Sequence, residues 1–367
     1  MITRLLCIAL FVVPAAAQAG DPGHVVLIVL GGGVRTKDTL KHETNTPNLK
    51  RIAEAGVVMP SCKIEAKLPI AAQRALMTGV LEEQPRERHL PSPHPTIGEI
   101  LRKDGQLPAS EVWFVVSGGG GETLLGSSDH AEYGPDYAPS TLAPDVVLSP
   151  TLKEQLSEMG VTDPPTRADE TALIRLLEAI DTSRAGSATA VDPGASGRAA
   201  VARFVLEELL RKDTGKPGEG DARALRAASS VLLGARPKFL CVMLRDATIA
   251  NRSYKNYEEV LKRNDLAIGA LWDAAQKDPQ LANKTTFVVV SDHGRNRKLD
   301  AKGALGYDDG THDATRVALI FQGHRFKRKE TIRIAVNTID VVPTICHLFG
   351  IKATTAKGKI VRTALAK

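Results

Sequence analysis

The hydrophobic positions of this chain follow two patterns. Unbroken apolar runs rich in valine, isoleucine and leucine are typical of strands that are buried on both faces. Such runs occupy residues 25–30, 57–59, 112–116, 239–244, 285–290 and 317–321. Between these runs, apolar residues recur at the spacing of a helix. They do so in residues 46–56, 74–79, 95–102, 173–180, 201–210, 222–233, 254–276 and 340–350. The alternation predicts an α/β fold with a mostly parallel central sheet and helices on both faces.

The middle of the chain interrupts this regular pattern. Residues 122–150 are rich in glycine, serine, proline and aspartate, and residues 183–197 and 212–221 are small and polar. We therefore expect one domain, residues 20–367, that carries a helical and loop insertion or cap at about 120–235. Four glycines follow the run 112–116, but no Lys-Ser or Lys-Thr stands at the distance that a phosphate-binding loop requires.

The first residues have the pattern of a secretory signal peptide. A short basic start ending at Arg4 precedes the apolar run Leu5–Val13, which is too short to cross a bilayer. Ala17-Gln18-Ala19 then supplies a cleavage motif. We predict a signal peptide at residues 1–19, cleaved after Ala19, and a secreted or periplasmic protein. No later run is long and apolar enough for a membrane span.

The charge of the chain restricts its partners. Lysine and arginine number 48 against 42 acidic residues, for a net charge of +6, and they are dispersed. The densest basic run, 324–329, lacks interleaved aromatic residues, so we expect a solvated loop and no nucleic-acid binding. A small anionic ester substrate or ligand is compatible with the charge. The cysteines Cys62, Cys241 and Cys346 show no paired spacing and are predicted to be buried thiols. The oligomeric state is not predicted.

Polar side chains with metal-binding chemistry stand at the ends of three predicted strands. Asp292 and His293 follow the run 285–290 after Ser291, Asp246 follows 239–244, and His312 precedes 317–321. Ligand sites in parallel sheets form at the carboxyl ends of the strands. Carboxylate oxygens and imidazole nitrogens are good ligands for divalent ions. We predict that these four side chains form a metal site.

Taken in order, several motifs resemble the alkaline phosphatase superfamily and, within it, the sulfatase and type I phosphodiesterase-like branch. They cover both ends of the mature chain and leave about 120–235 unmatched. The motifs are Thr46-Pro47-Asn48-Leu49, Gly56-Val57, Arg74 with Thr78-Gly79, Asp246, a helix with Tyr257 and Asp265, Ser291-Asp292-His293-Gly294, His312 before Arg316-Val317-Ala318-Leu319-Ile320, and Asp340-Val341-Val342-Pro343-Thr344.

The resemblance implies a specific chemistry. In that superfamily two divalent ions lie at the carboxyl edge of the sheet, and a serine, threonine or modified cysteine attacks a phosphate or sulfate ester. By this resemblance, Asp292 and His293 would serve the ion that holds the nucleophile, and Asp246 and His312 the other. The two ions would neutralise the tetrahedral oxyanion and stabilise the leaving oxygen.

Three of the expected groups are missing from this sequence. Gly31 stands where the family has an aspartate ligand, and no histidine follows Asp246 within the next residues. Ile70 lies in the segment where the nucleophile is expected, and the nearest hydroxyl and thiol upstream are Ser61 and Cys62. Each ion would keep only two protein ligands, whereas a catalytic ion typically has three. We therefore expect one bound ion (zinc, manganese or calcium) instead of two, and a protein without any bound ion is the alternative. We assign no catalytic residue.

Two functions stay open on the sequence. The first is an exported metal-dependent hydrolase of phosphoric or sulfuric esters, with an altered mechanism in which one ion activates water directly. The alternative is a catalytically inactive pseudoenzyme of the same fold that serves in binding or scaffolding. A phosphomutase or phosphotransferase would need the same missing nucleophile.

Overall fold

The computed structural model describes most of the chain. It covers residues 22–366 except 43, 67, 85, 119–120, 149–153, 155–165, 184–191 and 212–215. The predicted signal peptide, residues 1–19, lies outside the described residues. No helix in the described part of the chain is both long and apolar enough to cross a membrane.

A single eight-stranded sheet forms the centre of the molecule, with the strand order β4-β3-β5-β1-β6-β7-β2-β8. Strands β4, β3, β5, β1 and β6 are parallel, whereas β7 pairs antiparallel with both β6 and β2. The mostly parallel sheet is therefore confirmed. The strands are β1 His24–Leu30, β2 Val57–Lys63, β3 Val112–Val116, β4 Ser140–Leu142, β5 Phe239–Met243, β6 Thr285–Ser291, β7 Arg316–Gln322 and β8 Glu330–Thr331.

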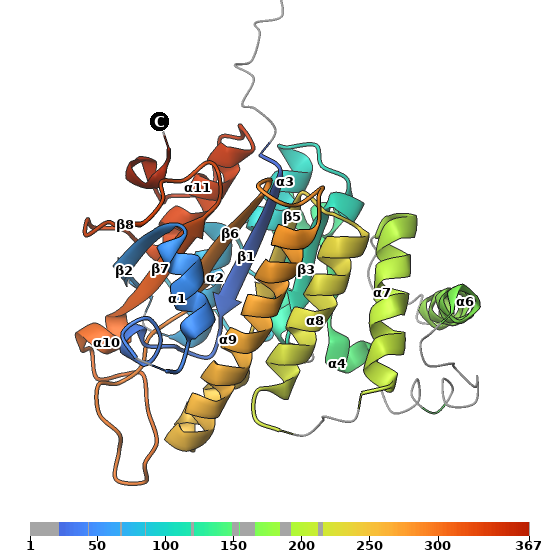
Figure 1. The fold of residues 1–367 in the computed structure, drawn as a ribbon. Helices are drawn as coiled ribbons and strands as arrows, with labels where there is room; N and C mark the ends of the chain where they lie inside the picture. The colour runs from blue at the N-terminus through green and yellow to red at the C-terminus, as the bar shows by residue number, and fades with distance from the viewer. Residues whose placement is uncertain are drawn as a thin grey trace, which may run out of the picture.

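Helices cover both faces of this sheet, as the sequence predicts. Helices α1, α7, α8 and α9 lie on one face, and α2, α3 and α11 on the other (Figure 1). The helices are α1 Pro47–Glu54, α2 Pro69–Thr78, α3 Ile97–Lys103, α4 Pro144–Val147, α6 Arg167–Ser183, α7 Gly194–Leu209, α8 Glu219–Gly234, α9 Tyr254–Lys277, α10 His312–Thr315 and α11 Val341–Leu348.

The central strand β1 supplies both hydrophobic cores. Val26 and Ile28 pack into the cluster under α1, α8 and α9, whereas Leu27 and Val29 pack into the cluster under α2, α3 and α11. Each of these side chains is fully buried, and burial of one such side chain contributes roughly 1.5–3 kcal/mol. This explains why the strand is apolar at every position from Val25 to Leu30 instead of at every second one.

Parts of the predicted insertion at about 120–235 lie within these layers. Strand β4 pairs with β3 at one edge of the sheet. Helix α8 packs beside α9 over the sheet face (Figure 1). The domain boundaries themselves stay a prediction. Cys62, Cys241 and Cys346 are buried and free, as expected.

Candidate functional site

Strand β6 ends beside the end of β1, and this pairing places the predicted Asp-His corner. The two strands run in register from His24 opposite Thr285 to Leu30 opposite Ser291. The segment Gly31–Gly33 that leaves β1 therefore lies against Asp292 and His293. Both side chains are buried, and Asp292 is fully inaccessible to solvent.

The carboxylate of Asp292 is enclosed by protein donors. It accepts hydrogen bonds from the backbone N–H groups of Gly32 (3.0 Å) and Gly33 (3.1 Å), and from Nε2 of Gln73 (2.8 Å). The His293 N–H donates at 2.7 Å, and Nδ1 of His293 makes an electrostatic contact at 2.9 Å without hydrogen-bond alignment. Burial tends to raise the pKa of Asp292, but the attraction of His293 and these hydrogen bonds outweigh it, and the pKa is lowered.

The two glycines are required for this arrangement. Gly32 and Gly33 have φ angles of +89° and +84°, in the left-handed region that side chains disfavour. A Cβ atom on Gly33 would lie 2.7 Å from Nε2 of His293. The backbone can therefore approach the carboxylate closely only without side chains at these positions.

Replacement of Gly33 by alanine is expected to lower the free energy of unfolding by about 1–3 kcal/mol, because strain at φ adds to the collision with His293. Gly303→Ala is the matched control: its φ is +75°, but nothing lies within 4 Å of the added Cβ. Urea denaturation of both variants separates the two effects. Equal losses in the two variants would show that contact with His293 adds nothing.

Helix α2 delivers Gln73 to the corner but no nucleophile. The helix begins at Pro69, and Ile70 packs against the apolar cluster on that face of the sheet. Arg74 is 2% exposed and donates to the carbonyl oxygens of Glu87 (2.7 Å), Leu90 (2.5 Å) and Arg86 (3.2 Å). The arginine thus stabilises the loop that follows the helix, and Gln73 is the residue of α2 that contacts Asp292.

Asp246 has a different set of partners. It lies just after β5, and its Oδ2 accepts the N–H of Asp221 (2.9 Å) in the first turn of α8. In return, the N–H groups of Asp246 and Arg245 donate to the Asp221 carboxylate at 3.1 and 2.7 Å. Asn264 of α9 donates to the same carboxylate at 2.7 Å. Asp246 and Asp221 therefore join the end of β5 to the start of α8.

His312 lies at the start of α10, just before β7. Its Nε2 is 3.1 Å from the hydroxyl Oγ of Ser61 on β2, and the imidazole is exposed. The backbone of α10 also reaches the corner: the carbonyls of Asp313 and Ala314 accept from Arg295 and Gly294 at 3.1 and 3.2 Å. His312 thus stands near the Asp292 segment, with a serine as its hydrogen-bond partner.

The four side chains predicted to hold a metal do not form one cluster of contacts. Asp292 and His293 contact each other. Asp246 instead contacts Asp221, and His312 contacts Ser61. Across the described residues, no group of three or more histidine, cysteine, aspartate or glutamate side chains has an arrangement that could hold an ion. The N–H donors around Asp292 occupy the oxygens that a cation would need. This arrangement does not fit the implied ion, and the metal site stays a sequence-based prediction.

Arg295 is a buried residue of the corner that the sequence patterns do not reveal. It is 1% exposed, and its guanidinium donates to the carbonyls of Gly32, Gly33 (3.0 Å), Ala247 (3.2 Å) and Leu305 (2.6 Å). A further donor reaches Oδ1 of Asn251 at 2.6 Å. The glycine segment is thus held by Asp292 through its N–H groups and by Arg295 through its carbonyls. The only available signal was the position of Arg295 directly after Asp-His-Gly.

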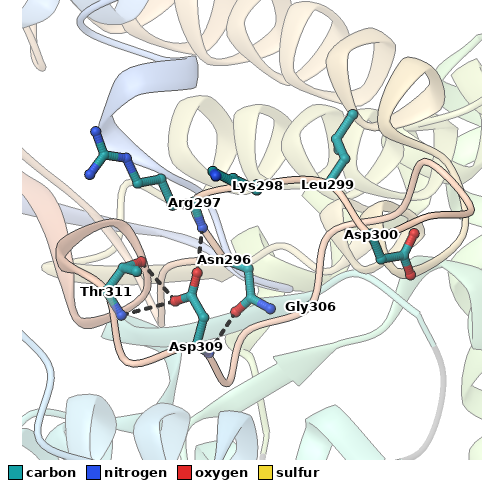
Figure 2. A pocket seen from close by; sticks show the side chains of 8 residues that line it. All are labelled: Asn296, Arg297, Lys298, Leu299, Asp300, Gly306, Asp309 and Thr311. Atoms are coloured by element: carbon teal, nitrogen blue, oxygen red, sulfur yellow. Dashed lines mark hydrogen bonds between the residues drawn. The ribbon is translucent and has the colours of Figure 1, made fainter.

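A cavity of about 380 Å³ opens in the segment that follows Arg295 (Figure 2). The Asp309 carboxylate in its wall accepts from the N–H groups of Arg297 (2.7 Å) and Thr311 (2.9 Å) and from the Thr311 hydroxyl (2.7 Å). The cavity is lined by Asn296, Arg297, Lys298, Leu299, Asp300, Gly306, Asp309 and Thr311. Thr311 directly precedes His312, so the cavity adjoins α10.

Solved structures share the fold of this chain at low sequence identity. A protein in the alkaline phosphatase superfamily from Vibrio parahaemolyticus aligns with a TM-score of 0.53 and 14% identity, covering 96% of this chain and 72% of that one. The PsFucS1 sulfatase from Pseudoalteromonas sp. aligns with a TM-score of 0.56 and 13% identity, covering 96% of this chain and 74% of that one. A mutant of the alkaline phosphatase PafA aligns with a TM-score of 0.55 and 11% identity, covering 95% of this chain and 99% of that one.

Sequence comparison gives the family directly. No curated protein matches the chain. The family model described as Sulfatase matches residues 148–351, which is more than half of the chain. This range contains Asp246, Asp292, His293 and His312. These solved structures show that the chain has the fold of the alkaline phosphatase superfamily, and the family model shows that it belongs to the sulfatase family.

Proposed function

We propose that this sulfatase-family protein has lost metal-dependent cleavage of phosphate and sulfate esters and serves as an exported binding protein for a small anion. The observation that carries the proposal is the enclosure of the Asp292 carboxylate by Gly32, Gly33 and Gln73. Export rests on the predicted signal peptide at residues 1–19.

The chemistry of the corner supports the loss of activity. Covalent ester cleavage needs a nucleophile with a lone pair, and the side chain of Ile70 has none. It also needs positive charge to stabilise the oxyanion as it forms. The charge of Asp292 is instead compensated by the hydrogen bonds that it accepts and by the attraction of His293. Together these lower the pKa of Asp292, although burial acts to raise it. Neither half of the mechanism for phosphate and sulfate esters has its residues in place at this corner.

The cavity of Figure 2 supports an anionic ligand. The carboxylates of Asp309 and Asp300 each accept backbone N–H groups of their own loop, so their charge is already solvated by the protein. The guanidinium of Arg297 and the ammonium of Lys298 have no side-chain partner among the described residues. Arg297 and Lys298 both belong to the cavity lining, so an anion that carries phosphate or sulfate would complement their charge.

Binding without turnover is the expected result. Titration of mature protein with 4-nitrophenyl phosphate and 4-nitrophenyl sulfate by calorimetry, with zinc or manganese added, should show binding but no release of nitrophenolate. Replacing Arg297 and Lys298 together by glutamine should weaken binding at least tenfold, because both cations are removed. Lys302→Gln, on the same loop but outside the cavity lining, is the control.

Two outcomes would contradict the proposal. Catalytic release of nitrophenolate that disappears in Asp292→Ala would restore the metal-dependent hydrolase. Equal weakening by Lys302→Gln and by the double variant would show a non-specific charge effect instead of binding in the cavity.

A further inference from the structure

Ser61 and His312 form a hydroxyl–imidazole pair that the proposed binding function does not use. Their side chains approach to 3.1 Å between Oγ and Nε2, although 251 positions separate them in the chain. A serine within hydrogen-bond distance of a histidine is the minimal unit of nucleophile and general base. Ser61 is half-buried and His312 is exposed, so a substrate can reach both.

A bulge in β2 aims Ser61 at this partner. Met59 pairs with Leu319 of β7 and Cys62 pairs with Val317, so three steps along β2 oppose two along β7. In a regular strand Ser61 would share the core-facing side of Met59. The extra residue instead gives the core position to Cys62, which is fully buried, and releases the hydroxyl of Ser61.

The backbone of the short helix that carries His312 is held in place from two sides. The carbonyl of Thr315, in the same short helix as His312, accepts the N–H of Ile64 just after β2 at 3.0 Å. On its other side, the carbonyls of Asp313 and Ala314 accept from the segment after β6. The pair therefore stands on the backbone that connects β2 with the Asp292 corner, next to the cavity wall at Thr311.

We propose that Ser61 and His312 are the nucleophile and base of a metal-independent hydrolysis of carboxylic esters. Oγ of Ser61 bonds to the ester carbonyl carbon while Nε2 of His312 takes the hydroxyl proton. The bond to the alcohol then breaks, and the imidazolium returns the proton to the leaving oxygen. Water, deprotonated by the same nitrogen, then attacks the acyl carbon. The acyl–Oγ bond breaks, the imidazolium returns the proton to Oγ, and the carboxylic acid leaves with Ser61 restored. The base role requires the tautomer of His312 that carries its proton on Nδ1.

The substrate class follows from the charges around the pair. A phosphate or sulfate ester brings negative charge to the reacting centre, which needs cations that this corner does not supply. A carboxylic ester is uncharged at its carbonyl carbon, so attack by a serine with a histidine base is feasible without a metal. Arg297 and Lys298 line the cavity that reaches Thr311, next to His312, so they favour a substrate with an anionic group away from that carbonyl.

Labelling with a fluorophosphonate, which reacts covalently with activated serines, tests the pair in the mature protein. We expect one adduct by intact-mass measurement, located by peptide mapping on Ser61. Ser61→Ala should abolish it, and His312→Gln should slow it at least tenfold. His89→Gln is the matched control, because this exposed histidine has no serine partner and pairs with Glu87. Hydrolysis of 4-nitrophenyl acetate should follow the same order among the variants.

A second variant keeps the test independent of folding. In Ser61→Cys, alkylation of the new thiol by iodoacetamide should be at least fivefold faster than in the double variant Ser61→Cys/His312→Gln. An adduct on another serine, or equal alkylation rates with and without His312, would overturn the proposal. The outcome is separate from the loss of phosphate and sulfate ester cleavage, because the probes and the residues differ.

Discussion

Replacing Arg295 by methionine is expected to lower the free energy of unfolding by about 3–5 kcal/mol. The guanidinium is 1% exposed and donates to four backbone carbonyls and to Asn251. Methionine fills similar space but donates nothing, so these buried oxygens lose their partners. Urea denaturation of both proteins at pH 7 measures the loss directly.

Arg297→Met provides the control for this prediction. Arg297 lies two positions further along the chain and its side chain is exposed, so the change should stay within about 0.5 kcal/mol. A loss below about 1 kcal/mol in Arg295→Met would show that water replaces the guanidinium at those carbonyls. The glycine segment would then not depend on Arg295 for its position.

Stability is expected to fall as the pH rises from about 4 to about 7, because of the carboxylate pair Asp221 and Asp246. Burial and the repulsion of Asp246 raise the pKa of Asp221 to about 7. Burial and the repulsion of Asp145 also raise the pKa of Asp246, against the opposing attraction of Arg245. The unfolded chain releases the Asp221 proton near pH 4, whereas the folded chain keeps it until about pH 7. The folded state therefore binds more protons in this window, and each step upward in pH costs stability.

The variant Asp221→Asn isolates this effect. Asparagine stays neutral at every pH, so the difference in unfolding free energy between wild type and variant should change by up to about 4 kcal/mol between pH 4 and pH 8. Asp273→Asn is the control, because the pKa of Asp273 is lowered by its hydrogen bond with Arg51 and it titrates below this window. Parallel pH curves for wild type and Asp221→Asn would refute the assignment.

Much of the fold follows from hydrophobic pattern. The run 285–290 and the helical spacing at 254–276 correspond to β6 and α9, whose first turn is capped by the Ser253 hydroxyl. The antiparallel direction of β7 was not predictable in this way, because an apolar strand has the same pattern in either direction. Strand β4 has only three residues, too few to show a period.

The candidate site was predictable only in part. Asp292 and His293 follow a buried strand, and their place at the sheet edge follows from the pattern alone. The partners of Asp246 were not visible, because Asp221 stands in a polar stretch whose helical period begins only afterwards. The contact between Ser61 and His312 depends on a bulge, which arises from strand pairing and leaves no trace in one sequence.

The metal content of purified mature protein tests the central claim most directly. After dialysis against zinc or manganese and removal of excess ion, mass spectrometry should find well under one ion per chain. The midpoint of thermal unfolding should not change on addition of EDTA, because Gly32, Gly33 and Gln73 already satisfy Asp292. One ion per chain that raises the midpoint, and that is lost in Asp292→Asn, would contradict this account.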